Sequence, residues 1–207
     1  MRGVIFTEFL DYVAASSGED AVDRMLDACP LASGGAYTSV GRYDHKEMLT
    51  LVGYLSEQTG LPAGELCHVF GAHLFGRFAD RYARFFRPGD TALDFLARVE
   101  THIHTEVRKL YPDAELPQFD CERPDPDTLV MTYRSTRPMA DCAHGLIDGH
   151  LGLARQRRDG PPHVTPGADE QRVDEAVLRQ RGLAHQGADQ RMMPQPAGPN
   201  APSVQVF

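Results

Sequence analysis

Long apolar runs, excess positive charge and paired cysteines are all missing from this sequence. No stretch approaches the roughly 18 apolar residues of a membrane span, and the start MRGVIFTEFLDYV lacks the features of a signal peptide. We therefore expect a cytoplasmic protein that does not enter the membrane. The net charge of −8 argues against a general nucleic-acid binder, because nothing offsets repulsion from phosphates.

The cysteines show no disulfide or zinc-binding pattern, and the sequence shows no repeat. The four cysteines lie far apart, with neither a paired framework nor a CxxC zinc spacing, and are interpreted as reduced thiols. No internal repeat is visible. At 207 residues the chain is long enough for one domain with a real core, with or without a tail.

Helical periodicity runs through the first two-thirds of the chain. Apolar spacing, capping patterns and proline positions predict helices over residues 4–13, 22–29, 44–60, 62–86 and 91–111. The fourth of these is strongly apolar, so it must be deeply buried. A helical lobe therefore begins the protein.

The period changes to two after Pro117. Residues 118–122 and 128–135 are predicted strands joined by the turn-rich RPDPD, and a short helix is predicted to begin at Pro138. From about residue 150 the sequence is rich in Arg, Gln, Pro and Gly, and Phe207 is the one aromatic after Tyr133. We expect an α+β domain over 1–150 and a low-complexity, largely disordered tail over 151–207, with a transient helix over 170–182.

One histidine of nine stands out by its position. On the predicted 91–111 helix, His104 lies on the flank of the apolar face, whereas His102 shares the charged side with Arg98, Glu106 and Lys109. The two cannot chelate one metal from a regular helix. His104 is thus either a metal ligand or a buried structural histidine, and position alone does not separate the two.

A second polar group lies on the segment YRSTR. Alternation on a strand places Tyr133, Ser135 and Arg137 on one face, where a guanidinium and two hydroxyls suit a dicarboxylate such as the haem propionates. A solvent-exposed strand face is the competing interpretation.

The sequence resembles the haem nitric oxide/oxygen binding (H-NOX) family, which is related to the haem domain of soluble guanylate cyclase. The resemblance covers about residues 1–150 and is carried by MRGVIFTEFLDYV, SGGAYTSVGRYDH, FGAHLFGRFADRY, HIHTEVRKLYPDAELPQF and YRSTRP. It implies a bacterial, stand-alone domain with an N-terminal helical lobe, a C-terminal lobe of helices packed on an antiparallel sheet, and haem between them.

The resemblance also assigns roles to residues. His104 is the implied proximal ligand of a ferrous haem b, Tyr133, Ser135 and Arg137 are the implied propionate clamp, and Pro117 presses on the porphyrin. The implied distal residues are apolar, and Cys142 stands where oxygen-binding relatives have a tyrosine. The distal set is Ile5, Phe9, Leu74 and Phe78.

An apolar distal wall offers bound oxygen no hydrogen bond, so the resemblance predicts selectivity for nitric oxide, with carbon monoxide as a weaker ligand. The implied mechanism is rupture of the bond between His104 and iron, followed by relaxation of the haem and the proximal helix. Relatives of this type signal to a separate histidine kinase or cyclic-di-GMP enzyme. No substrate is transformed.

The chain departs from the family at its far end. Relatives complete a four-stranded sheet after the helix around Ile147, whereas residues past 150 lack the apolar alternation for two more strands. Either this is a natural divergent tail or the reading frame has shifted near Gly149. The missing strands would leave the hairpin with an unpaired edge. No zinc is expected, because Cys142, His144 and His150 do not make a full ligand set.

Two other functions compete with the haem sensor. A haem peroxidase or oxygenase needs a distal histidine, arginine or acid, which the implied distal set lacks. A haem-free or haem-impaired protein-interaction module of the same fold is the alternative, if the incomplete sheet no longer holds the cofactor. The presence of His104 and the clamp residues favours the haem sensor.

Overall fold

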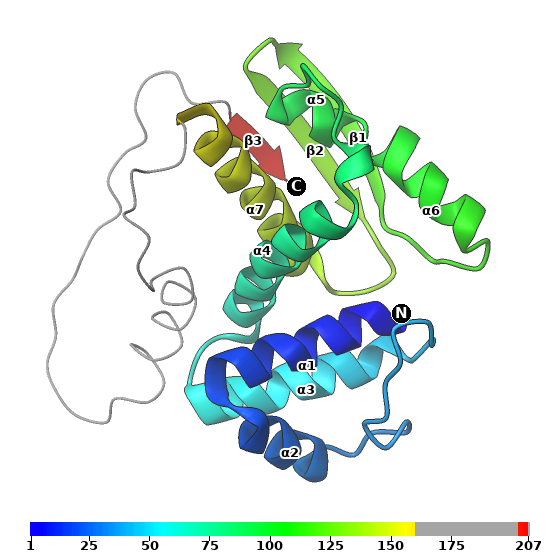
Figure 1. Cartoon of the computed structure of the whole chain (residues 1–207), viewed down its shortest axis with the longest axis vertical. Coiled ribbons are helices and arrows are strands. Elements are labelled where there is room, and N and C mark those ends of the chain that lie inside the picture. The colour runs from blue at the N-terminus through cyan, green and yellow to red at the C-terminus, as the bar shows by residue number, and fades with distance from the viewer. Residues whose placement is uncertain (160–202, 207) are drawn as a thin grey trace, which may run out of the picture. The chain divides into compact units, whose positions relative to one another are not determined.

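The computed structural model of the chain describes residues 1–159 and 203–206, which form two compact units (Figure 1). The described part of the first unit comprises residues 1–77 and 141–159, and that of the second comprises 78–140 and 203–206. Helices and a small sheet make up these residues, which confirms the predicted α+β class. Within them, no helix has the length and apolarity needed to cross a membrane.

The first unit is helical. Its elements are α1 (Gly3–Ser17), α2 (Glu19–Ala28), α3 (His45–Thr59), most of α4 (Ala63–Arg81) and nearly all of α7 (Ala140–Asp159). Its core is made of side chains that are at most 2% exposed. These are Phe6, Phe9, Met25, Met48, Leu51, Phe70 and Leu74.

The predicted bounds of α3 are confirmed, but one predicted cap residue has another role. Asp44 accepts a hydrogen bond from the backbone N–H of Lys46 at 3.0 Å, and Gly60 ends the helix in the left-handed conformation at φ 71°. Glu47 does not complete a capping box. Its buried carboxylate instead accepts from Ser33 Oγ at 2.5 Å and from the Tyr37 hydroxyl at 2.7 Å.

Helices α4 and α7 meet main chain to main chain. A Cβ added to Gly145 would lie 1.9 Å from the His68 carbonyl oxygen, and one added to Gly71 would lie 2.2 Å from the Cys142 carbonyl oxygen. Gly149 approaches Ala72 in the same way, one turn after Gly145 approaches His68, so the two helices run parallel. Glycine is required along this contact because only a missing side chain lets the backbones approach so closely.

The second unit contains η1 (Ala83–Phe85) and a broken helix where one continuous helix was predicted over 91–111. Its parts are α5 (Ala92–Ala97), the π-helical turn η2 (Val99–Ile103) and α6 (His104–Leu110). The carbonyl of Arg98 accepts from both His102 at 2.9 Å and Ile103 at 3.4 Å, which inserts one extra residue into the turn. The uninterrupted helix is therefore a wrong prediction.

The sheet of the second unit has three strands among the described residues. Strands β1 (Gln118–Asp125) and β2 (Thr128–Arg134) form the predicted antiparallel hairpin, and β3 (Ser203–Val206) pairs with β2 in parallel. The main chain of β3 thus covers the edge of β2 that was expected to be unpaired. Leu129 and Met131 of β2 are 1% exposed and form the core of this unit with the apolar residues of α5.

The far end of the chain is described only in part. Helix α7 was predicted to be short, yet it continues to Asp159, past the expected domain boundary at 150. The predicted transient helix over 170–182 and most of the predicted tail lie outside the described residues. The boundary at 150 and the choice between a natural tail and a shifted reading frame stay predictions.

Candidate functional site

His104 is the first residue of α6 and directly follows the π turn. Its side chain is 12% exposed, and its Nδ1 lies 2.8 Å from Glu100 Oε2. The extra residue in the turn shifts the helical phase, and Leu110, which a regular helix over 91–111 would place on the apolar face, is 60% exposed. His102 has different surroundings, because its ring centroid lies 6.1 Å from that of Phe85.

Glu100 joins three parts of the second unit. Its Oε1 accepts from Arg108 Nη2 at 2.7 Å, and its Oε2 accepts from the Phe119 backbone N–H at 3.4 Å as well as from the His104 ring. Burial works to raise the pKa of this carboxyl, but the hydrogen bonds from Arg108 and then His104 outweigh burial and lower it. Glu100 is therefore ionised and fixes one ring nitrogen of His104.

The environment of His104 suits a neutral imidazole. Burial lowers the pKa of His104, and the hydrogen bond to Glu100 opposes that change without reversing it. The backbone carbonyl of the half-buried Pro117 acts in the same direction as Glu100. With Nδ1 engaged by a carboxylate, Nε2 is the nitrogen that can coordinate a metal, which is the arrangement of histidine ligands in metalloproteins.

Aromatic rings connect His104 to the hairpin. The ring centroids of His104 and Phe119 lie 5.9 Å apart, and those of Phe119 and Tyr133 lie 5.6 Å apart. Phe119 and Tyr133 are directly paired across β1 and β2. The hairpin thus places the predicted clamp tyrosine one ring away from the predicted iron ligand.

Ser135 and Arg137 are placed by a turn and not by strand alternation. Strand β2 ends at Arg134, so the geometric argument for a shared strand face applies to Tyr133 alone. The backbone N–H of Arg137 donates to Ser135 Oγ at 3.0 Å, which ties these two residues together locally. The guanidinium, 14% exposed, donates to the carbonyl oxygen of Glu115 at 2.7 Å and to its Oε2 at 2.5 Å.

The predicted distal residues belong to helices of both units. Phe9 and Leu74 of the first unit are buried, Ile5 is half-buried, and Phe9 packs edge-on against Phe70 with ring centroids 5.1 Å apart. Phe78 belongs to the second unit, is half-buried and packs on Tyr82 at 5.8 Å.

Cys142, the remaining predicted site residue, is a buried thiol in the first unit. Burial raises its pKa to about 12, with smaller effects from Cys67 and Asp141. All four cysteines are free. A thiol in this state packs as a small apolar group.

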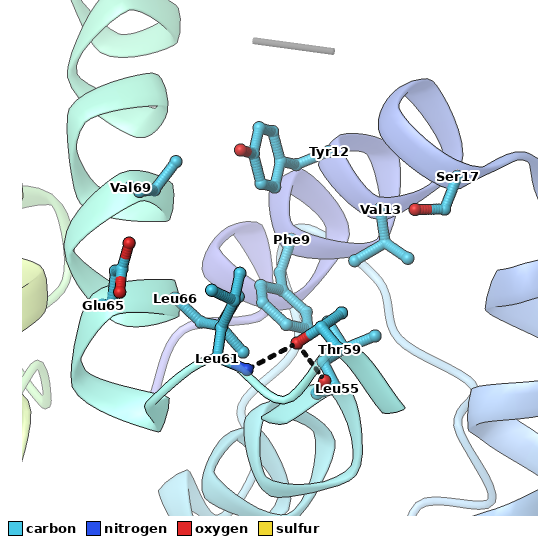
Figure 2. A pocket seen from close by; sticks show the side chains of 10 residues that line it. All are labelled: Phe9, Tyr12, Val13, Ser17, Leu55, Thr59, Leu61, Glu65, Leu66 and Val69. Carbon is cyan, nitrogen blue, oxygen red and sulfur yellow. Dashed lines mark hydrogen bonds between the residues drawn. The ribbon is translucent and has the colours of Figure 1, made fainter. Parts of the chain in front are cut away.

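A small apolar pocket lies within the first unit (Figure 2). Side chains of α1, α3 and α4 line it, including Tyr12, Val13, Leu55 and Val69. Thr59 Oγ1 on its wall donates to the Leu55 carbonyl at 2.7 Å and accepts from the Leu61 N–H at 3.3 Å. Of the predicted site residues it contains only Phe9, so it is distinct from the surroundings of His104.

Two residues of the network around His104 were not predicted from the sequence. Glu100 and Arg108 lie four residues before and after His104, a spacing that brings side chains together on a helix and could have revealed the network. Glu115 offered no such signal, because it lies in the irregular segment before β1 and 22 positions from Arg137.

The donor set fits a haem. An imidazole that is 12% exposed and held at Nδ1 by a carboxylate can ligate the iron through Nε2, and the Arg137 guanidinium already binds a carboxylate, the group that a propionate presents. Fold and site together thus define a haem-binding domain of mixed α and β structure.

Comparison with known proteins places the chain within a family. The profile described as Haem-NO-binding matches residues 2–153. The unliganded Fe(II) H-NOX protein of K. algicida is 39% identical with a TM-score of 0.71, and the match covers 75% of this chain and 84% of that one. The chain belongs to the Haem-NO-binding, or H-NOX, family, whose members are haem gas sensors.

Other solved H-NOX structures show the same fold. The H-NOX of Shewanella woodyi, solved in the Fe(II)CO state with IWP-051 bound, is 39% identical with a TM-score of 0.65, over 75% of this chain and 82% of that one. The S. oneidensis protein in the Fe(II)NO state is 26% identical with a TM-score of 0.69, over 75% and 86%. No curated protein matches the chain.

Proposed function

We propose that the protein is a nitric oxide sensor that binds a ferrous haem b through His104, with carbon monoxide as a weaker ligand. The observation that carries the proposal is the imidazole of His104, which is 12% exposed and held at Nδ1 by Glu100 at 2.8 Å, while burial lowers its pKa. That hydrogen bond sets the tautomer, so the lone pair of Nε2 is directed to the metal. Glu100 is itself held by Arg108, which keeps the carboxylate ionised and in place.

When bound, a ferrous haem held by His104 would supply the iron that takes up nitric oxide. The rest of the response belongs to the chain. His104 stands at the junction of η2 and α6, so its release from a metal would remove a restraint at the least regular point of the helix. Glu100 and Arg108 would keep the imidazole on the hairpin side.

Binding of the haem periphery is assigned to Tyr133, Ser135 and Arg137. The contact between Arg137 and Glu115 supports this, because Nη2 of the guanidinium already binds a carboxylate oxygen while Nη1 binds the backbone carbonyl of the same residue. In the proposal a propionate replaces Glu115, whose side chain is 66% exposed and can move into solvent. Pro117, whose carbonyl acts on His104, is the proposed contact that bends the porphyrin.

Selectivity for nitric oxide over oxygen rests on the distal assignment of Ile5, Phe9, Leu74 and Phe78. These side chains carry no hydrogen-bond donor, and bound oxygen needs one whereas ferrous nitrosyl does not. The thiol of Cys142, with its pKa raised to about 12 chiefly by burial, replaces the tyrosine of oxygen-binding relatives. A sensor that transforms no substrate needs a receiver, and we propose a separate bacterial histidine kinase or cyclic-di-GMP enzyme.

The deciding experiment is an absorption spectrum of the purified, reduced protein before and after nitric oxide is added. We expect a Soret band of five-coordinate ferrous haem that shifts with nitric oxide and resists oxygen. A folded protein without a Soret band would refute the proposal and support the haem-free interaction module.

Ligand identity is tested by the pair His104→Gly and His102→Gly. The first should lose the unliganded spectrum and regain it with added imidazole, which can occupy the space of the missing ring. The second removes a histidine two residues away and should keep the native spectrum. A native spectrum in His104→Gly without imidazole would assign the ligand to another residue.

A further inference from the structure

Three metal-ligating side chains meet on the first unit, in the described part of α4 and α7. His68 comes from α4, and His144 and Asp148 lie one turn apart on α7. His68 Nε2 lies 2.9 Å from Asp148 Oδ2, and His144 Nε2 lies 3.9 Å from the same oxygen. The two imidazole rings face each other edge to plane with centroids 5.1 Å apart.

The separations suit a tetrahedral ion. Ligand atoms about 2.05 Å from zinc stand about 3.4 Å apart, and the observed 2.9 and 3.9 Å lie on either side of that value. All three ligand atoms lie within 4.8 Å of one another. Small side-chain rotations would therefore bring the two nitrogens and the oxygen onto one ion.

The backbone beneath this cluster is held firmly. Gly145 is the residue after His144, and its backbone touches the His68 carbonyl where any larger residue would clash. The glycine contact thus keeps the turn of α4 that bears His68 directly against the turn of α7 that bears the other two ligands. A metal site benefits from such a frame because its ligands are ordered before the ion arrives.

Access is open as well. The side chains of His68, His144 and Asp148 are 34%, 52% and 47% exposed, so an ion can reach them and a water can complete its coordination. The expectation of no zinc rested on Cys142, His144 and His150. Only His144 of these belongs to the cluster, and the structure adds His68 from α4 and Asp148 from α7.

We propose that His68, His144 and Asp148 bind one divalent transition-metal ion, with Zn²⁺ as the natural occupant, and that this ion links α4 to α7. Two imidazoles and one carboxylate favour Zn²⁺, Ni²⁺ or Cu²⁺, whereas Mg²⁺ and Ca²⁺ prefer oxygen ligands alone. The three ligands belong to the first unit and His104 belongs to the second, and the metal proposal does not depend on the haem proposal. An ion bound only by the folded state stabilises it by mass action.

The first test is calorimetric titration of the full-length protein, stripped with EDTA, with Zn²⁺ and separately with Mg²⁺. We expect one Zn²⁺ per chain, no response to Mg²⁺, and a raised melting temperature with Zn²⁺ alone. His68→Ala and His144→Ala should each weaken binding by roughly tenfold or more. His45→Ala is the control, because it removes a histidine paired with Asp44 at the start of α3 and should bind Zn²⁺ normally.

The second test identifies the ligand atoms by X-ray absorption at the zinc edge, which haem iron does not disturb. We expect nitrogen and oxygen neighbours at about 2.0–2.1 Å with the signature of two imidazoles. A sulfur neighbour at about 2.3 Å would overturn the proposal in favour of the nearby thiols Cys67 and Cys142. Full binding by the His68→Ala, His144→Ala double variant, or no binding at all, would overturn it too.

Discussion

The contact of α4 with α7 and the surroundings of His104 are built on opposite principles. Where α4 packs on α7, the backbones touch because Gly71, Gly145 and Gly149 have no side chains, so the contact depends on shape alone. Around His104, polar side chains hold one another in place by hydrogen bonds, with Glu100 accepting from both His104 and Arg108. A steric contact tolerates no added atom, whereas a polar network tolerates changes of shape but not of charge.

The steric contact gives the largest predicted effect. Gly145→Ala forces a Cβ to 1.9 Å from the His68 carbonyl, so α7 must shift, and the free energy of unfolding should fall by about 3 kcal/mol despite the better helix propensity of alanine. Chemical denaturation measures the change, and hydrogen exchange shows whether the loss lies in α4 and α7.

Gly152→Ala is the matched control on the same helix. A Cβ there meets nothing within 4 Å, so alanine should stabilise the protein by about 0.5–1 kcal/mol. Equal effects of the two substitutions would contradict the steric account of this contact.

The polar network gives the next effect. Glu100→Gln keeps the size of the side chain but removes its charge, which weakens the hydrogen bonds from His104 and Arg108. We expect a loss of about 1 kcal/mol, a modest value because the Arg108 side chain is 40% exposed. In the haem-bound protein, resonance Raman should also show a lower iron–histidine stretching frequency, because a carboxylate partner makes the imidazole a stronger ligand.

Glu106→Gln provides the comparison for that variant. Glu106 forms an ion pair with Lys109 on the surface of α6, so both the stability and the stretching frequency should stay at the native values. A stretching frequency that is native in Glu100→Gln would mean that Glu100 has a structural role only.

These two regions also differ in how far the sequence predicted them. The helices of the first unit follow from apolar spacing, and the start and end of α3 follow from Asp44 and Gly60. The parallel contact of α4 with α7 could not be predicted, because it depends on glycines far apart in the chain. His104 was predicted to lie on the flank of the apolar face, and its side chain is 12% exposed, but its partner Glu100 was overlooked.

The π turn and the end of β2 escaped prediction for local reasons. A π turn adds one residue to a hydrogen-bonded turn and leaves no mark in the amino-acid composition. A helical wheel drawn for a regular helix therefore placed Leu110 on the apolar face, whereas it is exposed. Strand alternation was extended past Arg134 to Ser135 and Arg137, where a turn takes over. The parallel pairing of β3 joins segments so distant in sequence that no local pattern announces it.

A local cap in the second unit offers an effect of similar size. Thr91 and Asp94 form a full capping box at the start of α5, in which Thr91 Oγ1 accepts from the Asp94 N–H at 3.1 Å. Thr91→Ala should lower the free energy of unfolding by about 1 kcal/mol, and Thr91→Ser, which keeps the hydroxyl, should restore most of it. Thermal unfolding of both variants measures the difference, and equal losses would show that the methyl group matters more than the cap.

The smallest predicted effect is a pH dependence at the same cap. Hydrogen bonds from Thr91 and then from Arg123 lower the pKa of Asp94 to about 2. A carboxyl whose pKa is lower in the folded state contributes stability above its unfolded pKa of about 3.9, and this contribution is lost as the pH falls toward 2. The side chain is 37% exposed, so solvent screening should keep the contribution below about 1 kcal/mol.

Asp94→Asn removes this titrating group, so comparison with the native protein shows in which direction the stability contributed by Asp94 changes with pH. The difference in free energy of unfolding between the native protein and Asp94→Asn should be largest near pH 5 and shrink between about pH 4 and 2. Arg123→Ala keeps the cap but removes the bond to Asp94 Oδ1 at 2.6 Å, so it should retain part of the pH dependence. If Arg123→Ala abolishes all of it, the ion pair and not the cap holds the carboxylate ionised, and this corner of the second unit would resemble the network around Glu100.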